Sequence, residues 1–332
     1  MKGTDLHSLE ICAGAGGQAL GLERAGFHHV ALVENEPAPC ATLRANRPGW
    51  RILENDVRDL NGRDFHGIDL LSGGVPCPPF SIAGKQLGHA DERDLFPVAL
   101  RLAEQCQPRA MILENVPGLS KARFAGYRAM ISENLRRLGY SVDWQVVNAC
   151  NYGVPQLRPR FVLVAFKGKA AQRFSWPQPR HAPPTVGEML HDLMASRGWR
   201  GADSWMRQAN GIAPTLVGGS KKHGGPDLGP SRAKAAWREL GVDALGLADD
   251  APDDQFPTGG LPKLTVPMTA RLQGFPDSWT IVGRKTAAYR QVGNAFPSPV
   301  AYRVGKAVRH AILGTRSEED IPHPRRQLQT AG

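Results

Sequence analysis

The chain has 332 residues, 41% of them hydrophobic and 22% charged, which is typical of a globular protein with two domains or with one large domain and an insertion. Lys and Arg number 41 against 31 Asp and Glu, and the net charge of +10 favours a polyanionic partner, although a mildly basic enzyme without one also fits. The five cysteines form no Cys-x-x-Cys pair, so we expect no metal site. There is no signal-peptide pattern and no apolar run of roughly 18 residues, so we expect a cytoplasmic protein without a membrane segment.

The first predicted unit is a strand, a glycine turn and a helix. Residues 6–12 are predicted to form a short buried strand, and Ala13-Gly14-Ala15-Gly16-Gly17 leads into a helix that ends before Gly26. Glycines let the backbone approach a ligand, and a helix N-terminus favours negative charge, so this turn is a candidate cofactor loop. Ala19 stands where a dinucleotide-binding G-x-G-x-x-G pattern has its third glycine, and many glycine turns merely connect elements.

Two carboxylates follow the next two predicted strands. Glu34 closes the strand over 30–33, about 20 residues after the glycine turn, where it can accept hydrogen bonds from ribose hydroxyls. Asp56 follows the third strand and is placed either to accept from an adenine amino group or to cap the segment that begins near Arg58. Either carboxylate alone is more typical of a structural residue, but the pair beside a glycine turn predicts a cofactor that contains a nucleoside.

The fourth strand, over 68–71, leads into Gly73-Gly74-Val75-Pro76-Cys77-Pro78-Pro79-Phe80-Ser81. Proline fixes φ and lacks an N–H group, so we predict a stiff loop at the C-terminal end of the strand, where open α/β sheets place their chemistry. Cys77 is therefore a candidate nucleophile, and a small buried thiol in a turn is the equally weighted alternative. The polar segment 84–93 has the composition of a mobile lid.

The remaining elements continue the alternation of strands and helices. They are a helix over 94–107, a strand over 110–113, a helix over 127–138, strands over 142–148 and 161–166, and a last helix over 298–312. Between 167 and 263 the alternation is lost and Gly, Pro, Trp and basic residues are frequent. We therefore predict a large α/β domain over 1–166 and 268–315, a smaller inserted domain over 167–267, and a disordered tail over 316–332.

Three sets of candidate catalytic side chains are predicted to lie at one edge of the sheet. Cys77 follows the fourth strand, and Glu114 ends the fifth. Arg158 and Arg160 precede the seventh. A thiol with an ordinary pKa of about 8.5 is only a few per cent thiolate at neutral pH, and one of these arginines would be the cationic neighbour that favours the thiolate. With a carboxyl group opposite, the arrangement suits attack on an electron-poor heteroaromatic ring.

Six short blocks of the sequence, in this order along the chain, resemble those of a known family. They are Ala-Gly-Ala-Gly-Gly, Gly-Gly-Val-Pro-Cys-Pro-Pro-Phe-Ser, Glu-Asn-Val, Gln-Leu-Arg-Pro-Arg, Leu-Gln-Gly-Phe-Pro and Arg-Gln-Val-Gly-Asn-Ala. Through them, residues 7–166 and 264–312 resemble the DNA (cytosine-5)-methyltransferase family, in its bacterial restriction-modification form. The resemblance implies a doubly wound, Rossmann-like, S-adenosylmethionine-dependent methyltransferase sheet, with a target-recognition domain at 167–267.

The resemblance also implies roles for the candidate catalytic residues. Cys77 would attack C6 of a cytosine flipped out of the duplex, and Glu114 would contact and protonate N3. C5 would then take the methyl group from S-adenosylmethionine, and loss of the C5 proton with β-elimination would release the cysteine. Asn115 would hold the loop that carries Glu114, while Arg160, with Arg158, would position the base and support the adduct.

The implied binding residues fall into a cofactor set and a DNA set. In the cofactor set the glycine turn would approach the methionine moiety, Glu34 would bind the ribose and Asp56 the adenine. That set is Ala13, Gly14, Gly16, Gly17, Glu34, Asp56, Val57, Gly74, Pro76, Leu95, Asn294 and Ala295. The DNA set is Ser81, Lys221, Lys222 and His223. The implied partner is double-stranded DNA bound by a monomer, together with a restriction endonuclease that acts on the same sequence.

A few positions depart from the family pattern. They are Cys12 in place of Phe, Asn35 in place of a bulky residue, Pro78 in place of Gln, and Pro267-Met268 in place of Arg-Glu. None removes a reacting group, so we expect effects on cofactor affinity and lobe packing. Three alternatives remain: a tRNA cytosine-5 methyltransferase, a non-catalytic DNA-binding relative, and a nicotinamide oxidoreductase, which the missing third glycine disfavours.

Overall fold

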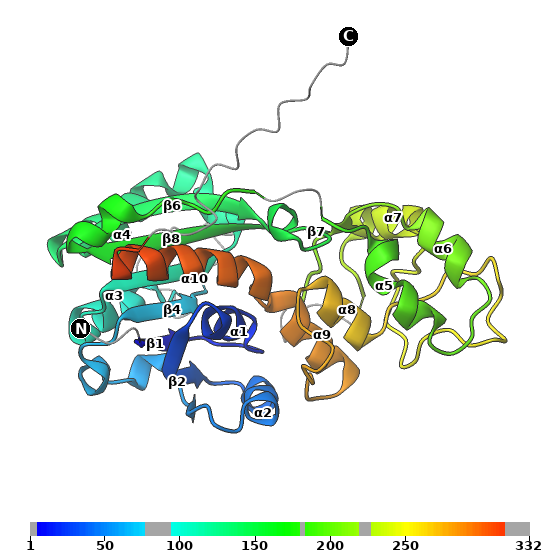
Figure 1. Ribbon diagram of the computed structural model, residues 1–332, viewed down its shortest axis with the longest axis horizontal. Helices are drawn as coiled ribbons and strands as arrows, with labels where there is room; N and C mark the ends of the chain where they lie inside the picture. The colour runs from blue at the N-terminus through cyan, green and yellow to red at the C-terminus, as the bar shows by residue number, and fades with distance from the viewer. Residues whose placement is uncertain (1–4, 77–93, 180–182, 219–226, 316–332) are drawn as a thin grey trace, which may run out of the picture.

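The computed structural model describes residues 5–76, 94–179, 183–218 and 227–315 (Figure 1). Within these ranges a seven-stranded sheet has the strand order β3-β2-β1-β4-β5-β8-β6. Its strands are β1 (Leu6–Ile11), β2 (Phe27–Glu34), β3 (Ile52–Glu54), β4 (Leu70–Gly74), β5 (Ala110–Asn115), β6 (Tyr140–Asn148) and β8 (Pro159–Lys167). The order reverses direction between β1 and β4, which confirms the predicted doubly wound α/β sheet and creates a switch point between these two strands.

The direction of β8 decides where its first residues lie. Strands β1 to β5 are parallel to one another, whereas β8 runs antiparallel to both β5 and β6. Asn115, at the end of β5, pairs with Phe161, near the start of β8. The start of β8 therefore lies at the same edge as the C-terminal ends of the parallel strands.

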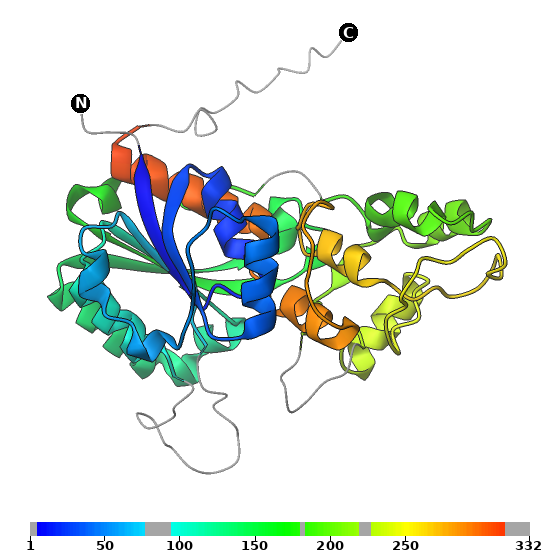
Figure 2. The ribbon, with the colours of Figure 1, turned by 90° about the horizontal axis from the view of Figure 1, so that it is seen from below.

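Helices cover both faces of the sheet, because the central strands are apolar on both sides (Figures 1 and 2). Alternate residues of β5 point to opposite faces: Met111 and Leu113 belong to one hydrophobic cluster, while Ala110 and Ile112 belong to the other. The first cluster includes α3 (Phe96–Cys106) and α4 (Ala125–Arg137). The second includes α1 (Gly17–Arg24) and α10 (Ser298–Leu313).

The C-terminal helix packs closely on the first helix. A Cβ on Gly21 of α1 would lie 2.5 Å from the carbonyl oxygen of Ser298 and from Cβ of Ala301. On α10, a Cβ on Gly305 would lie 2.7 Å from the side chain of Leu22. These glycines let the last helix complete the large lobe beside β1.

The second lobe has its own hydrophobic cluster, in which Trp199, Trp205 and Trp237 are buried. Its helices are α5 (Val186–Ala195), α6 (Ala202–Gln208), α7 (Ser231–Glu239), α8 (Val266–Leu272) and α9 (Lys285–Asn294). The cluster continues past residue 267 into α8 and α9 through Met268 and Tyr289. The segment from α8 to α9 thus contributes to the second lobe as well as to the large one.

The other described elements are short or lie at the sheet margins. They are α2 (Pro37–Asn46), the two-residue strands β7 (Gln156–Leu157) and β9 (Ala213–Pro214), and the 3-10 helices η1 (Val57–Asp59), η2 (Gly62–Phe65), η3 (Pro117–Ser120), η4 (Ala122–Phe124), η5 (Ala149–Tyr152) and η6 (Gly168–Arg173). Strand β7 pairs with β9 and so joins the two lobes. Within the described part of the chain, no helix is long and apolar enough to span a membrane.

Candidate functional site

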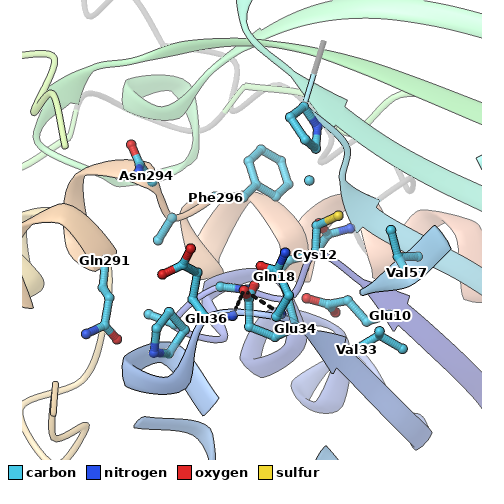
Figure 3. Close-up of a pocket in the computed structure, with 18 of the residues that line it drawn as sticks. Glu10, Cys12, Gln18, Val33, Glu34, Glu36, Val57, Gln291, Asn294 and Phe296 are labelled. Carbon is cyan, nitrogen blue, oxygen red and sulfur yellow. Dashed lines mark hydrogen bonds between the residues drawn. The ribbon is translucent and has the colours of Figure 1, made fainter. Parts of the chain in front are cut away.

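A cavity of about 790 Å³ opens at the C-terminal edge of the sheet, across the switch point between β1 and β4 (Figure 3). Ten of the predicted cofactor residues line it, together with the two candidate catalytic residues that the structure places here. They are Ala13, Gly14, Glu34, Asp56, Val57, Gly74, Pro76, Leu95, Asn294 and Ala295, with Glu114 and Arg160. One cavity therefore extends from the end of β3 to the end of β5.

Glu34 is fixed by backbone groups at the end of β2. Its Oε2 accepts a hydrogen bond from the N–H of Gly14 at 2.8 Å, which ties the glycine turn to β2. Its Oε1 accepts from the N–H groups of Asn35 and Glu36, both at 2.9 Å. Oε2 can accept one further hydrogen bond, so the residue presents an oriented acceptor to a ligand with hydroxyl groups.

Asp56 has the capping role that the sequence allowed, and it also lines the cavity. It is the N-cap of η1, where its Oδ1 accepts from the N–H of Arg58 at 2.9 Å. The Arg58 guanidinium also forms an ion pair with Oδ2 at 2.6 Å. Hydrogen bonds from the Arg58 side chain and backbone lower the pKa of Asp56, so its carboxylate is ionised at neutral pH.

Two of the predicted cofactor glycines have a packing role. Gly16 and Gly17 are not among the described residues that line the cavity. Gly16 has φ of 85°, and a Cβ there would lie 2.6 Å from the side chain of Leu43. A Cβ on Gly17 would lie 2.3 Å from the carbonyl oxygen of Phe296. Their lack of a side chain lets the turn and α1 contact neighbouring elements closely, and a cofactor contact at these two glycines stays a prediction.

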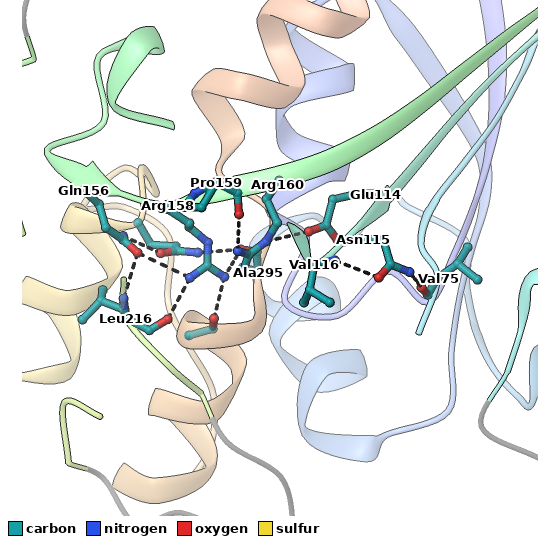
Figure 4. A network of polar contacts seen from close by, with 12 residues as sticks. Val75, Glu114, Asn115, Val116, Gln156, Arg158, Pro159, Arg160, Leu216 and Ala295 are labelled. Atoms are coloured by element: carbon teal, nitrogen blue, oxygen red, sulfur yellow. Dashed lines mark hydrogen bonds and ion pairs between the residues drawn. The ribbon is translucent and has the colours of Figure 1, made fainter. Parts of the chain in front are cut away.

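Glu114 and Arg160 form an ion pair at the other end of the cavity (Figure 4). Glu114 is the penultimate residue of β5 and Arg160 is the second residue of β8, and the Nε of Arg160 lies 2.6 Å from Oε1 of Glu114. Both side chains are about nine-tenths buried. Burial raises the pKa of Glu114, and the guanidinium groups of Arg160 and Arg158 oppose that shift. Glu114 is therefore a carboxyl group suited to proton transfer, and the guanidinium of Arg160 holds it in place.

Asn115 ties the end of β5 to the loop that follows β4. Its Nδ2 donates to the carbonyl oxygen of Val75 at 2.7 Å, and its Oδ1 accepts from the N–H of Val116 at 2.8 Å (Figure 4). Further along that loop, the N–H of Leu95 donates to the carbonyl oxygen of Pro76 at 3.2 Å. Both contacts fix backbone at the cavity wall next to Glu114.

Arg158 is completely buried, and it is absent from the described cavity lining. Its Nη1 donates to the carbonyl oxygen of Leu216 at 2.7 Å, and its Nη2 donates to those of Gly293 and Ala295 at 2.6 and 3.0 Å (Figure 4). Burial lowers its pKa. The turn before β8 points Arg158 into the junction of the two lobes, so any part that it has in positioning a base would be through the backbone that it holds.

Several predicted residues lie outside the described part of the chain. They are Cys77, Ser81, Lys221, Lys222 and His223. Pro76, which precedes Cys77, lines the cavity. Over the described ranges, no group of three or more His, Cys, Asp or Glu side chains is arranged to hold a metal ion.

The cavity also contains two polar residues that the sequence reasoning missed. Glu10 in β1 and Gln18 in α1 both line it, and their side chains are almost completely buried (Figure 3). Burial raises the pKa of Glu10 to about 8, opposed by a hydrogen bond from Ser72. Two features of the sequence indicate this buried polar wall. A glutamate lies in a strand that is predicted to be buried, and a glutamine directly follows the glycine turn.

Comparison with known proteins agrees with this geometry. A model of the C-5 cytosine-specific DNA methylase family matches residues 6–310. The type II methyltransferase M.NaeI of Lentzea aerocolonigenes is 58% identical over 92% of this chain and 75% of its own length. The type II methyltransferase M.NgoMIV of Neisseria gonorrhoeae is 53% identical over 92% of this chain and 97% of its own length.

Solved structures show the same fold. The Dnmt2 methyltransferase of S. pombe matches with a TM-score of 0.62 at 20% identity, over 90% of this chain and 97% of that one. The family model spans nearly all of the described sheet and the second lobe, and two relatives share more than half of their aligned residues with this chain. The chain therefore belongs to the C-5 cytosine-specific DNA methylase family and is a DNA (cytosine-5) methyltransferase.

Proposed function

We propose that this protein transfers a methyl group from S-adenosylmethionine to C5 of a cytosine flipped out of duplex DNA, through a transient bond between Cys77 and C6. The observation that carries the proposal is the Glu114–Arg160 pair, buried in a cavity that continues to Glu34 and Asp56. A protonatable carboxyl group and a set of nucleoside-binding acceptors are thereby combined in one site.

The residues present suit an S-adenosyl cofactor. Glu34 has an oriented carboxylate with an acceptor site left on Oε2 for a ribose hydroxyl. Asp56, which follows the next strand outward, supplies an ionised acceptor for the adenine amino group. Val57, which is buried beside Asp56, offers apolar surface for the base. When bound, the cofactor supplies a methyl group on a positively charged sulfur. Gly74 and Pro76 leave room for that end of the cofactor beside Glu114.

Proton transfer in the proposed reaction centres on Glu114. Its raised pKa favours the protonated form, which donates a hydrogen bond and then a proton to N3 of cytosine. As the thiolate of Cys77 adds to C6, electron density moves through the ring and makes C5 nucleophilic. After C5 has taken the methyl group, which leaves S-adenosylhomocysteine, a water molecule accepts the proton from C5 and the C6–S bond breaks. The aromatic ring is restored, the thiolate of Cys77 is released, and N3 returns its proton to Glu114.

The second lobe is proposed to recognise the DNA sequence. Its segment between β8 and α8 is inserted into the chain of the large lobe, and the pairing of β7 with β9 connects it to that lobe (Figure 1). Its helix α9 also contributes Gln291 and Asn294 to the cavity lining. Lys221 and Lys222 would contact phosphates, and Ser81 and His223 would lie near the target base pair. Positive charge supplies affinity, whereas contacts to base edges supply specificity.

The biological role proposed here is protection of host DNA within a restriction-modification system. Support comes from the two similar proteins at 53% and 58% identity, which are both type II methyltransferases. The protein would then act in the cytoplasm as a monomer, and a restriction endonuclease that recognises the same sequence would be its functional partner.

A methylation assay tests this proposal. The protein is incubated with S-adenosylmethionine labelled in its methyl group, together with either duplex DNA or transfer RNA, and cytosine methylation is then mapped along the DNA. We expect label at C5 of cytosine within one short DNA sequence and none in transfer RNA. Label in the RNA alone, or label that is independent of DNA sequence, would contradict the proposal.

A further inference from the structure

The carboxamide of Gln18 is the feature of the cavity that the proposed function leaves without a role. Both of its polar atoms, Oε1 and Nε2, are buried and have no hydrogen-bond partner among the residues that the structure describes. The residue is 4% exposed and lines the cavity. An unpaired buried amide costs free energy, so such a group calls for a partner that enters the cavity.

The position of Gln18 along the sheet edge indicates which part of a ligand it meets. Asp56 follows β3 and Glu34 ends β2, so they mark the proposed nucleoside end of the cavity. Gly74 ends β4 and Glu114 is the penultimate residue of β5, so they mark the proposed methyl-transfer end. In the strand order, β1 and the turn that leads to Gln18 lie between these two ends.

The chemistry of the surrounding wall is complementary to a zwitterion. Gln18 is the second residue of α1, and the first N–H groups of a helix have no partner within it. The N-cap Gly16 provides no side-chain cap, and the first turn contains no acidic residue, so the positive end of this helix is not compensated locally. Nearby, Oε1 of Glu10 is also buried and without a described hydrogen-bond partner, and it lies on the same side of the cavity (Figure 3).

We propose that the Gln18 carboxamide binds the α-amino-acid end of the cofactor and thereby selects cofactors that carry it. An amide offers one donor group and one acceptor, which match the carboxylate and the ammonium of that end. Gln18 is a binding residue in this account and has no part in the chemistry of the base. The inference rests on the proposed use of S-adenosylmethionine.

Two adenosine ligands that differ at that end provide the test. S-adenosylhomocysteine carries the amino-acid group, whereas 5′-methylthioadenosine has the same nucleoside and sulfur but lacks it. Binding of each is measured by titration calorimetry to the wild type and to Gln18→Met, which retains the length of the side chain without its polar atoms. We expect Gln18→Met to bind S-adenosylhomocysteine about tenfold more weakly, the loss of one buried hydrogen bond, and 5′-methylthioadenosine within about twofold of the wild type.

Two further variants make the result specific. Glu34→Gln alters the nucleoside end and should weaken both ligands by the same factor. Gln18→Glu retains size and polarity but replaces the donor with a carboxylate, so it should weaken S-adenosylhomocysteine at least as much as Gln18→Met does. Unfolding midpoints measured without ligand show whether each variant is folded.

The outcomes separate this inference from the proposed function. Equal weakening of both ligands by Gln18→Met, or no weakening of either, would overturn the role of Gln18 while leaving the proposed function intact. Failure of the wild type to bind S-adenosylhomocysteine would instead refute the proposed cofactor.

Discussion

Glu114 occupies an environment in which burial and a neighbouring cation act in opposite directions on its pKa. Burial raises it, and the guanidinium of Arg160, 2.6 Å away, limits the rise. A group of this kind can be protonated at Oε2 when the base binds, while Oε1 remains oriented by a hydrogen bond from the guanidinium. The proton that the proposed reaction needs at N3 is therefore held where the base would enter.

The role of this carboxyl group predicts a loss of rate in Glu114→Gln. The amide has the same shape but cannot transfer a proton, so the methylation rate should fall by about 10²- to 10⁴-fold. Because the carboxyl group acts in its protonated form, the rate of the wild type should fall as pH rises through the raised pKa, and the variant should lack this decline. Single-turnover methylation across a pH series measures both effects, and unchanged binding of S-adenosylhomocysteine is the control. A variant that retains the wild-type rate and pH profile would refute the role of Glu114.

Glu10 predicts a pH dependence of folding stability. Its pKa is raised from 4.5 to about 8 in the folded state, so between these values the folded protein retains a proton that the unfolded chain has lost. Stability contributed by this group therefore falls as pH rises through that window, by up to about 1.4 kcal/mol per pH unit. Glu10→Gln lacks this penalty, and its stability relative to the wild type should increase by roughly 2–3 kcal/mol between pH 5.5 and 7.5. Urea unfolding at both pH values measures the difference, and a difference independent of pH would contradict the account.

The element that organises the site is the glycine turn together with α1, which contacts the C-terminal segment on one side and the cavity on the other. Gly17 begins α1 where the carbonyl oxygen of Phe296 approaches, and the indole N–H of Trp279 donates to the carbonyl oxygen of Ala15 at 3.1 Å. Gly14 faces the cavity with φ of 54°. A single turn thus serves packing at Gly17 and ligand access at Gly14.

This division predicts different effects of alanine at two glycines. Gly17→Ala places a Cβ 2.3 Å from the backbone oxygen of Phe296, which cannot move without shifting the C-terminal segment, so we expect a loss of at least about 2 kcal/mol of unfolding free energy. Gly126→Ala in α4 is the matched control, because no described atom lies within 4 Å of its added Cβ and its φ is not positive. It should be neutral or stabilise by about 0.4–1 kcal/mol. Equal stability of the two variants in urea unfolding would contradict the packing role of Gly17.

Local patterns predicted the elements better than they predicted what individual side chains face. Strand β5 and helix α10 were found from hydrophobic periodicity and flanking residues, which depend only on nearby sequence. The packing contacts of Arg158 and Gly17 could not be predicted, because residues more than 100 positions away provide their partners. Gln18 was missed because burial within a cavity is not visible in a sequence pattern. The roles of Cys77 and of the proposed DNA contacts stay predictions.

At the scale of the whole molecule, a buried polar network joins the two lobes. Arg158 links the turn before β8 to Leu216 of the second lobe and to the end of α9. Gln156 donates to Oε1 of Gln273 at 2.8 Å, and Gln273 in turn donates to the carbonyl oxygen of Ala295. The lobe proposed to read DNA is therefore connected, through fixed hydrogen bonds, to the strand that carries Arg160.

Removal of Arg158 should therefore affect stability more than chemistry. Arg158→Met removes the donor from the buried carbonyl oxygens of Leu216 and Gly293, while that of Ala295 retains the hydrogen bond from Gln273, and we expect a loss of more than about 3 kcal/mol in urea unfolding. Arg160→Met is the comparison, because it removes a cation from the cavity wall and should lower the methylation rate with a smaller loss of stability. The reverse pattern, with Arg158→Met stable but inactive, would return Arg158 to the role of a direct base contact.

The central claim is that Cys77 bonds covalently to the target cytosine while Glu114 acts from the opposite wall. The most direct measurement uses a long duplex in which 5-fluorocytosine replaces cytosine. Release of the enzyme requires C5 to lose its proton, and fluorine in place of that proton cannot leave, so the covalent bond persists. With S-adenosylmethionine present, we predict a protein–DNA complex that survives denaturing electrophoresis with the wild type and is absent with Cys77→Ser. A complex that persists in Cys77→Ser, or no complex from a wild type that methylates ordinary DNA, would contradict the account.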